Sequence, residues 1–427
     1  MSDRLEVELF GRSAGTVAIS GPLRSPEDWT FAYSEDYLAS DKPVALSVSL
    51  PLRREPHAGA PVRNWFCNLL PEGAVREAVG ARLRIPDRDD FALLAAIGGE
   101  CAGAVSIRAP DAAPVSLQDE ETDLETLLYL QGEDAGEGSW ALVGAPLRLS
   151  LAGAQDKIAV IVEPDGRLRL PRLGESSTHI LKPDSRRFRG LRDLEGLGLT
   201  LARAIDLDAA HVVPIEVANR PALLIERYDR KTDVEGDTQR LHQEDFCQAL
   251  GYPSELKYEV QGGPGLLACS RLVRQLGLGP IAVQGLLDWV AFNVLIGNAD
   301  AHAKNLALLC DHNGRRRLAP FYDLVPTLAL PESLIDRTPA LRIGEARRID
   351  NISANDWRAF ASQTGYGSRF VLRRVVELAD AVLSHLSISA ASIVQHGGDE
   401  ARVQRAANII AKNARQTRNR IAGPATD

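Results

Sequence analysis

The sequence lacks every cysteine spacing that is typical of a structural zinc site or a disulfide framework. No two cysteines form a Cys-x-x-Cys pair, and their number is odd. The five are Cys67, Cys101, Cys247, Cys269 and Cys310. This pattern predicts buried free thiols in a reducing cytosol.

An excess of positive charge is also missing. The chain has 49 Lys and Arg against 57 Asp and Glu, which gives a net charge of −8. Such a balance excludes a generic nucleic-acid coat and leaves room only for a local basic patch. One segment, residues 401–423, has six basic residues and no acid. It fits a solvated cationic helix end at least as well as a phosphate contact.

Neither a targeting segment nor a membrane-length hydrophobic run is evident. The first ten residues contain acids where a signal peptide needs an apolar stretch. The longest apolar stretch, Leu286–Ile296, is interrupted by Asp288 and Asn293 and is too short to span a bilayer. We therefore expect a cytoplasmic protein with no membrane partner.

What is present is ordinary globular composition over 427 residues, with 45% hydrophobic and 25% charged residues. This length predicts two or three units of roughly 100–200 residues each. The first part contains short stretches rich in Val, Ile, Thr and aromatic residues, separated by Gly and Pro, as is typical of strands. Strands are expected at 5–11, 15–19, 30–34, 44–50 and 101–107. Helices are expected over 69–83, with Pro71 in the first turn, and over 91–99, capped by Asp89 or Asp90.

An acidic segment separates this first part from the rest. Eight acids and no Lys or Arg occur between Asp119 and Glu137, which favours a solvated boundary. The predicted organisation is an N-terminal subdomain (1–110), an acidic linker (111–146), a small lobe (147–235) and a helical large lobe (236–427).

The second half begins with strands and ends with helices. A hairpin is expected from 158–162 and 167–170, joined by Glu163-Pro-Asp-Gly166. Further strands are expected at 179–184, 212–218 and 222–229, with a helix over 193–207 among them. Helical periodicity then fills 271–278, 283–297 and 369–386. A small β-rich lobe with one helix followed by a large helical lobe is the layout of a two-lobed kinase.

Three polar residues follow the pattern that phosphoryl transfer requires. Asp300 and Asn305 have the D-x-x-x-x-N spacing of a kinase catalytic base and a metal-binding amide. After two strand-like patches, 306–310 and 315–320, Asp323 stands where a second metal-binding carboxylate is expected. The alternative is a polar turn after a helix, where Asp and Asn are common.

Upstream residues offer a phosphate cradle and a cation. The loop Ser150–Lys157 precedes a strand, and its backbone N–H groups are suited to phosphate oxygens. It has a single glycine and matches neither Gly-rich consensus, so an ordinary loop with Ser150 in a local turn remains the alternative. Lys182, at the end of a strand, is placed to reach the α/β-phosphates and to pair with Glu195. A surface lysine and an unrelated helical glutamate would look the same.

Taken together, these stretches resemble the HipA family, the serine/threonine-kinase toxins of bacterial type II toxin–antitoxin modules. The N-terminal stretches are NWFCNLLPEGAVRE and FALLAAIGGECAGAVSI. The later ones are LSLAGAQDKIAV, THILKPD, LLIERYDR, LHQEDFCQALG, KYEVQGGPG, NVLIGNADAHAKN and LAPFYDLVPT. QEDFCQALG and GGPG have no general kinase meaning and are specific to this family.

The resemblance implies an α+β, two-lobed protein-kinase-like fold preceded by a β-rich N-terminal subdomain. It also implies roles for individual residues. Asp300 would accept the proton, and Asn305 and Asp323 would bind Mg²⁺. The residues around ATP would be Ala152, Gly153, Ala154, Gln155, Asp156, Lys157, Lys182, Glu226, Tyr228, His302, Lys304, Asn305, Tyr322 and Asp323. Ser150 occupies the place of the family's autophosphorylated serine, whose modification ejects the phosphate loop and silences the kinase.

The implied function is an ATP- and Mg²⁺-dependent kinase that phosphorylates a translation protein, typically an aminoacyl-tRNA synthetase, and causes growth arrest and persistence. Its implied partner is a dimeric HipB-like helix-turn-helix antitoxin, with which it would repress its operon and through which it would mainly reach operator DNA. Two departures from ordinary kinases, Tyr322-Asp323-Leu324 for Asp-Phe-Gly and Asn298-Ala299 for His-Arg, look like family features.

Two other functions remain open. A small-molecule phosphotransferase of the aminoglycoside type shares the D-x-H-x-x-N loop, although QEDFCQALG and the N-terminal subdomain argue against it. A kinase-derived co-repressor without catalysis is the other, and the intact Asp300, Asn305, Asp323 and Lys182 argue against that.

Overall fold

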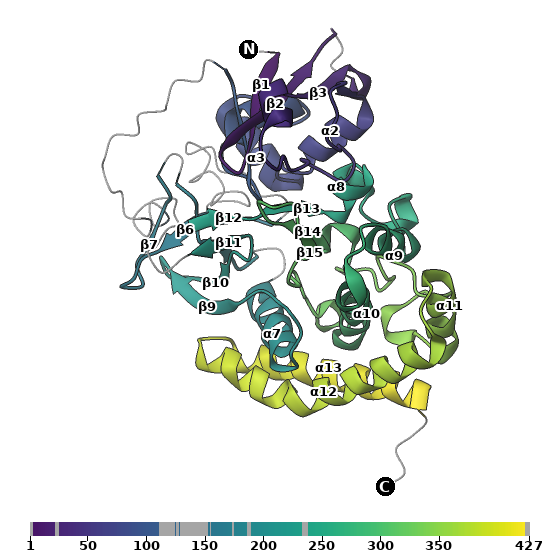
Figure 1. Cartoon of the computed structure of the whole chain (residues 1–427). Coiled ribbons are helices and arrows are strands. Elements are labelled where there is room, and N and C mark those ends of the chain that lie inside the picture. Colours follow the sequence, from purple (N-terminus) through teal and green to yellow (C-terminus); the bar gives the residue numbers. More distant parts are fainter. Residues whose placement is uncertain are drawn as a thin grey trace. The chain divides into compact units, whose positions relative to one another are not determined.

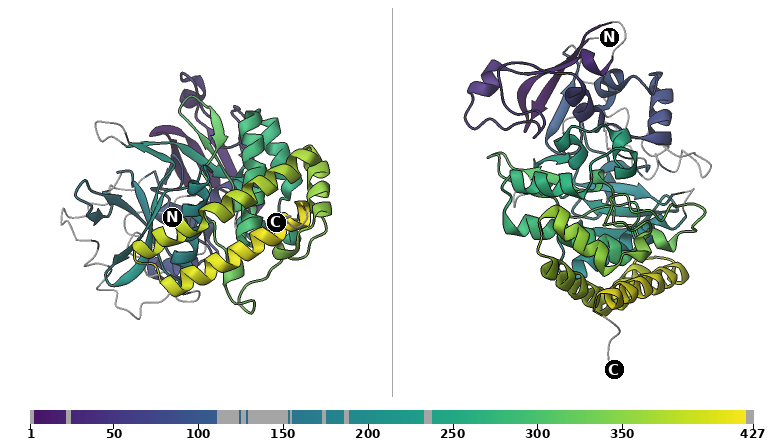
Figure 2. Two further views of the ribbon diagram at one scale, coloured as in Figure 1. Left: turned by 90° about the horizontal axis from the view of Figure 1, so that it is seen from below. Right: turned by 90° about the vertical axis from the view of Figure 1, so that its right-hand side faces the viewer.

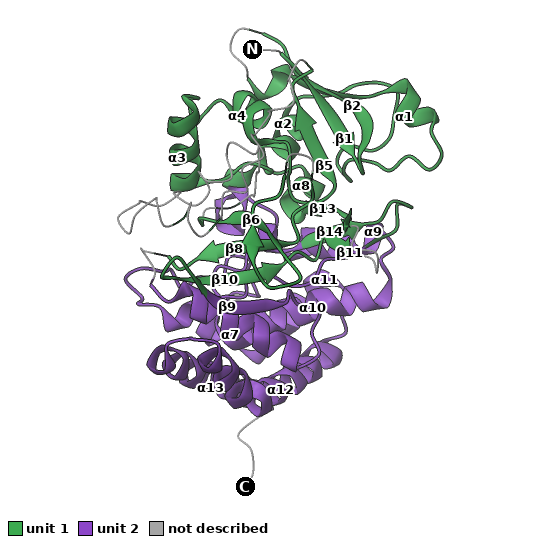
Figure 3. Cartoon of the chain, turned by 90° about the vertical axis from the view of Figure 1, so that its left-hand side faces the viewer, with its two compact units in different colours: residues 1–185, 216–255, 307–316 green, residues 186–215, 256–306, 317–427 purple. Residues whose placement is uncertain are grey.

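The computed structural model describes residues 3–21, 25–110, 124, 128, 153, 155–172, 175–185, 189–232 and 238–422 (Figure 1). It is an α+β chain whose contacts divide it into two units (Figure 3). Unit 1 contains residues 1–185, 216–255 and 307–316. Unit 2 contains residues 186–215, 256–306 and 317–427.

The N-terminal part of unit 1 is a five-stranded antiparallel sheet in the order β4-β3-β2-β1-β5. Its strands are β1 (Arg4–Leu9), β2 (Arg12–Ile19), β3 (Trp29–Tyr33), β4 (His57–Ala58) and β5 (Val105–Arg108). Inward residues alternate with outward ones along β1, as the period of a strand requires. The helices are α1 (Glu35–Ala39), α2 (Ala60–Cys67), α3 (Gly73–Leu83) and α4 (Asp90–Ile97). Their inner faces and that of the sheet bury a core that includes Trp29, Phe31, Trp65 and Phe66.

The strand predicted over 44–50 is absent, and that prediction is wrong. Side chains take the place of a neighbouring strand as hydrogen-bond partners of this backbone. The Tyr33 hydroxyl donates to the Leu50 carbonyl and accepts from the Leu46 amide, and the Tyr37 hydroxyl bonds both backbone groups of Val44. Buried backbone groups need partners, but a strand is not the only source of them.

Helix boundaries follow the capping residues. Asp89 caps α4 by accepting a hydrogen bond from the Ala92 amide, as one of the two predicted caps. Helix α3 begins at Gly73, four residues after the start of the predicted range 69–83, because Pro71 lies in an extended segment that forms a parallel bridge with Gly153.

The second sheet has the order β7-β6-β8-β10-β9. Its strands are β6 (Ile158–Val162), β7 (Leu168–Arg169), β8 (His179–Pro183), β9 (Val212–Val217) and β10 (Arg220–Glu226). The predicted hairpin is therefore confirmed. Two smaller sheets follow, β11 (Arg230–Thr232) with β12 (Thr238–Arg240), and β13 (His242–Asp245) with β14 (Ala307–Cys310) and β15 (Arg316–Leu318). Helix α8 (Phe246–Leu250) continues directly from β13.

Unit 2 is built from long helices. They are α7 (Leu191–Ala204), α9 (Leu266–Gln275), α10 (Gly279–Ile296), α11 (Ala354–Thr364), α12 (Ser368–Gln395) and α13 (Glu400–Ala422). Helices α12 and α13 lie side by side, and α7 packs against both (Figure 2). Helices α10 and α12 are long and apolar enough to cross a membrane by composition alone, but two-thirds of α10 is buried, as in a core helix. All five cysteines are buried free thiols, as predicted.

Candidate functional site

The predicted catalytic base lies in a loop that follows α10 in unit 2. Gly297 ends the helix with a left-handed φ of 74°, which turns the chain into residues 298–305. Asp300 is half-buried, and its Oδ1 accepts a hydrogen bond of 2.8 Å from the hydroxyl of Tyr258. This contact holds the carboxylate in one orientation.

Hydrogen bonds within the loop fix the backbone around Asp300. The Asp300 amide donates to Asn298 Oδ1 (3.1 Å), and the Asp300 carbonyl accepts from Asn305 Nδ2 (3.2 Å). The Ala299 amide donates to Thr327 Oγ1 (2.8 Å). Because Asn305 uses its amide nitrogen in the loop, its amide oxygen is the atom suited to a metal ion.

Tyr258 was not among the predicted site residues. Its ring meets His302 edge to face, with 5.3 Å between centroids. The only available signal was its place in KYEVQGGPG, a stretch without general kinase meaning. Gly263 of that stretch is required for packing, since a Cβ there would lie 2.2 Å from the Leu256 carbonyl oxygen.

Asp323, the predicted metal ligand, has a left-handed φ of 56°. Such a conformation is uncommon outside glycine and is often found at functional sites. Its carbonyl accepts a long hydrogen bond (3.4 Å) from Asn298 Nδ2, which connects it to the loop 298–305. The neighbouring Tyr322 hydroxyl donates to the Lys304 carbonyl. Unit 2 therefore brings the loop 298–305 and the segment around Asp323 together.

The donor set of Asn305 and Asp323 suits Mg²⁺, which prefers carboxylate and amide oxygens and keeps several waters. Among the described residues, no cluster of three or more His, Cys, Asp and Glu side chains exists. An oxygen site of one amide and one carboxylate is compatible with that finding, because the remaining ligands of a kinase metal come from phosphates and water.

The far end of unit 2 supports the same loop. Asn413 of α13 is buried, and its Nδ2 donates to the carbonyls of Val294 (2.7 Å) and Leu295 (3.0 Å). These are among the last carbonyls of α10, which no residue of that helix can satisfy. Helix α13 thus caps the helix from which the loop 298–305 extends.

The remaining predicted residues lie in unit 1. Lys182 is buried in β8, opposite Leu223 of β10. Glu226 ends β10 opposite His179 and is exposed, and the half-buried Tyr228 follows. Lys182 and Glu195 fall in different units, so their pairing stays a prediction.

The described part of the predicted phosphate loop contacts the N-terminal subdomain. The Gly153 carbonyl accepts a hydrogen bond from the Glu72 amide (3.0 Å), beside the Pro71–Gly153 bridge. Gly153 has a φ of 114°, and a Cβ there would lie 2.8 Å from Lys157 Nζ. Gln155 Nε2 donates to the Pro183 carbonyl at 3.4 Å, at the end of β8. Asp156 is half-buried.

Some predicted residues lie outside the described ones. They are Ser150, Ala152, Ala154 and the linker 111–146 apart from the helical residues 124 and 128.

The QEDFCQALG stretch joins the N-terminal subdomain to β13 and α8. Glu244 accepts hydrogen bonds from Ser47 Oγ (2.5 Å) and the Val48 amide (3.0 Å). Burial raises the pKa of Glu244 to about 7 despite these donors. Gln248 Nε2 donates to the Trp65 carbonyl (3.1 Å). The stretch is therefore a docking element and holds none of the predicted ATP contacts.

Comparison with known proteins supplies the wider context. Residues 149–386 match the family model of the HipA-like C-terminal domain, and residues 5–108 match that of the HipA N-terminal domain. Y4mE of Sinorhizobium fredii, which carries a provisional kinase name, is 40% identical over 397 residues, 92% of this chain and 94% of that protein.

A second organism supplies another relative and a solved structure. The serine/threonine-protein kinase toxin HipA of Shewanella oneidensis is 28% identical over 371 residues, 82% of each chain. A structure of the HipA, HipB and operator DNA complex of Shewanella oneidensis contains a chain with the same fold. It matches with a TM-score of 0.78 and 24% identity, over 97% of both chains.

Proposed function

The chain belongs to the HipA family, a family of kinases, and we propose that it transfers the γ-phosphoryl group of ATP to a serine or threonine of a protein. One observation carries the proposal. Unit 2 holds Asp300, Asn305 and Asp323 in one hydrogen-bonded assembly, with the carboxylate of Asp300 oriented by Tyr258.

The reaction proposed for this assembly is direct displacement. The acceptor hydroxyl oxygen forms a bond to the γ-phosphorus, the bond from that phosphorus to the β–γ bridging oxygen breaks, and ADP leaves. The hydroxyl proton passes to the carboxylate of Asp300. A positioned base of this kind contributes about 10²–10⁴-fold to a rate.

The other residues would bind and orient the nucleotide. Asn305 and Asp323 would hold Mg²⁺, which when bound offsets the charge of the phosphates. Lys182 would contact the α/β-phosphates from β8, and the loop 152–157 would cover them. Glu226 and Tyr228 would lie beside adenine, and His302, Lys304 and Tyr322 would line the same site.

The names of two related proteins support a proposal for the biological role. The relative in Shewanella oneidensis is a toxin, and the matched structure contains HipB and operator DNA. We therefore propose that this chain is a cytoplasmic toxin that phosphorylates a translation protein, for which an aminoacyl-tRNA synthetase is the first candidate. Growth arrest and persistence would follow. A HipB-like antitoxin would bind it, and the pair would repress their operon on DNA.

Control by autophosphorylation completes the proposal. Ser150 would be the modified residue, just before the loop that covers the ATP phosphates. A phosphoserine adds about −1.5 to −2 charge at neutral pH. Repulsion between that charge and the phosphates of ATP would release the loop and stop the kinase.

Incubation of the purified, dephosphorylated chain with γ-labelled ATP, Mg²⁺ and a bacterial lysate tests this function. We expect a discrete labelled protein, whose identity mass spectrometry gives, together with label on Ser150. The Asp300→Asn variant should lose transfer by about 10²–10⁴-fold. Asp208→Asn serves as the matched control, since Asp208 is an exposed carboxylate of the same unit.

Each other outcome points elsewhere. Label on small molecules alone would mean a small-molecule phosphotransferase. No transfer from the parent chain would favour a co-repressor without catalysis. Equal transfer by Asp300→Asn and the parent would remove Asp300 from the mechanism.

A further inference from the structure

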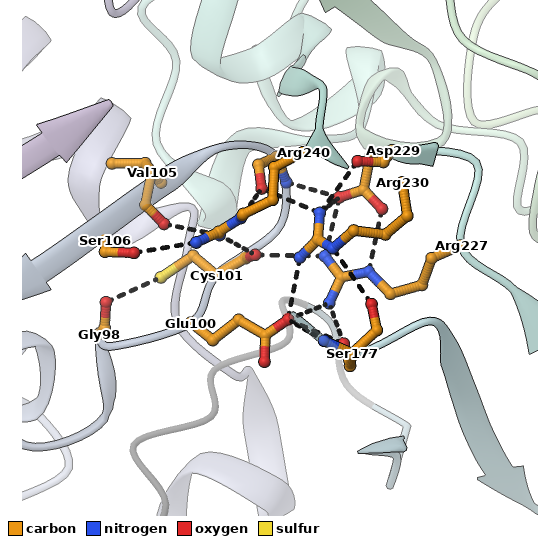
Figure 4. Close-up of polar contacts among 11 residues, drawn as sticks. Gly98, Glu100, Cys101, Val105, Ser106, Ser177, Arg227, Asp229, Arg230 and Arg240 are labelled. Atoms are coloured by element: carbon orange, nitrogen blue, oxygen red, sulfur yellow. Dashed lines mark hydrogen bonds and ion pairs between the residues drawn. The ribbon is translucent and has the colours of Figure 1, made fainter. Parts of the chain in front are cut away.

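A buried ionic cluster joins the N-terminal subdomain to the strands that carry the predicted nucleotide residues. We call it the Glu100 cluster (Figure 4). Its members are Glu100, Ser177, Arg227, Asp229, Arg230 and Arg240, all within unit 1. Figure 4 shows the three guanidinium groups and two carboxylates converging on the turn that leads from α4 into β5.

Glu100 accepts four of the hydrogen bonds in the cluster. Its Oε1 accepts hydrogen bonds from the Ser177 amide (3.0 Å), Ser177 Oγ (2.8 Å), Arg227 Nη1 (3.2 Å) and Arg230 Nη2 (2.9 Å). Glu100 Oε2 is buried and has no hydrogen-bond partner among the described residues. One carboxylate oxygen therefore joins three separate points of the chain.

The three arginines also bond Asp229 and backbone carbonyls of the turn 98–103. Arg227 forms a two-pronged pair with Asp229, with Nε–Oδ1 at 2.9 Å and Nη2–Oδ2 at 2.8 Å. Arg230 donates to the Gly103 carbonyl (3.1 Å), and Arg240 donates to the carbonyls of Gly103 (2.9 Å) and Cys101 (3.1 Å). The turn 98–103 is thus held by its backbone as well as by Glu100.

Burial makes the balance of charge in the cluster important. Three arginines face two carboxylates, and the side chains of Glu100, Arg227, Asp229 and Arg230 are each at most 8% exposed. Burial would raise the pKa of Glu100, but Arg227, Arg230 and Arg240 outweigh it and hold the pKa below its usual value. Burial, together with the charge of Arg230, lowers the pKa of Arg240 to about 10. Removing the charge of Glu100 would leave three buried arginines facing a single carboxylate, which is strongly unfavourable.

The cluster contacts the nucleotide strands at their ends. Ser177 lies two residues before β8, the strand of Lys182. Arg227 lies between Glu226 and Tyr228, the two residues predicted beside adenine. Its amide also donates to the Thr178 carbonyl (3.0 Å), so the two strand ends are joined in the backbone too.

We propose that Glu100 is a positioning residue for nucleotide binding. Its carboxylate sets the spacing between the start of β8 and the end of β10 and so fixes the backbone that meets adenine. This inference rests on the proposed kinase function and deepens it, because it assigns the N-terminal subdomain a part in nucleotide affinity.

A single charge change tests the proposal. Glu100→Gln keeps the shape of the side chain and removes its charge. We expect the KM for ATP, and the Kd of a non-hydrolysable ATP analogue by calorimetry, to rise about tenfold, while kcat changes less than threefold. Ser177→Ala, which removes one hydroxyl from the cluster, is the milder variant and should raise KM about threefold.

Asp90→Asn is the matched control. Asp90 is a carboxylate of similar burial that pairs with Arg63 (2.7 Å) and Arg76 (2.5 Å) inside the N-terminal subdomain. It should lower the melting temperature to a similar degree as Glu100→Gln and leave KM unchanged.

The outcomes separate this inference from the proposed function. Equal KM values for Glu100→Gln, Ser177→Ala and the parent would overturn the positioning role and leave the kinase proposal standing. If Glu100→Gln does not fold, the KM of Ser177→Ala decides in the same way. Weakened analogue binding in a chain that transfers no phosphate would support positioning and overturn the kinase. A parent chain that binds no nucleotide would overturn both.

Discussion

The two units hold their predicted site residues by contacts of different range. In unit 2, Asn298, Asp300 and Asn305 bond one another within a single short loop. In unit 1, the strands of Lys182 and Glu226 are tied by Glu100, which lies 77 residues from Ser177 and 127 from Arg227. The unit 2 loop also receives contacts from Tyr258 and Thr327, which lie 42 and 28 residues from their partners in the loop. The unit 1 strands depend on contacts over longer sequence distances, made with a separate subdomain.

The largest effect is expected where Gly103 of the N-terminal subdomain packs against Gln243 in unit 1. Gly103 has a φ of 76°, and a Cβ there would lie 2.5 Å from the Gln243 amide nitrogen and 3.0 Å from its carbonyl oxygen. Gly103→Ala should lower the free energy of unfolding by about 4 kcal/mol, since backbone clash adds to left-handed strain. Gly11, with a φ of 71° and no atom within 4 Å of an added Cβ, is the control. Gly11→Ala should cost about 1 kcal/mol. Equal losses in urea denaturation would contradict the proposed clash.

A second prediction concerns pH and Glu244, which bonds Ser47 and Val48 of the N-terminal subdomain. The pKa of Glu244 is raised from 4.5 to about 7 by burial, so the folded chain keeps a proton that the unfolded chain loses. The free energy of unfolding should therefore fall by about 3 kcal/mol as the pH rises from 4.5 to 7 and level off above that.

Denaturation at pH 5 and pH 8 measures this dependence. Glu244→Gln should remove most of the fall, because its side chain carries no charge at either pH. Glu6→Gln, at an exposed position of β1, should leave the fall intact. A parent chain that is equally stable at both pH values would count against the raised pKa.

The smallest expected effect concerns unit 2, where Tyr258 contacts Asp300. Tyr258→Phe removes the hydroxyl that orients Asp300 and should lower kcat about tenfold, or about 1.4 kcal/mol, with the KM for ATP unchanged. Tyr366→Phe is the control, because that hydroxyl bonds the Val283 carbonyl. A kcat equal to that of the parent would mean that the loop alone orients the carboxylate.

This difference in range also explains what the sequence could predict. The spacing of Asp300 and Asn305, the hairpin β6–β7 and the Asp89 cap depend on neighbours in the chain, and each pattern is legible in a short window. The irregular segment 44–50 has the composition of a strand, but Tyr33 and Tyr37 satisfy its backbone. Nothing near Glu100 or Tyr258 indicates their partners, because those partners are brought to them only by the tertiary fold.

The position of Asn413 late in the chain means that the end of α10 is synthesised well before the residue that caps it. Asn413 bonds the end of α10, yet the ribosome adds it more than a hundred residues after Asp300. A nascent chain in which residues 298–305 have already left the ribosome still lacks α13, the helix that caps the C-terminal end of α10. For a chain proposed to block translation, activity would thus be withheld from the growing polypeptide until α13 has emerged and packed.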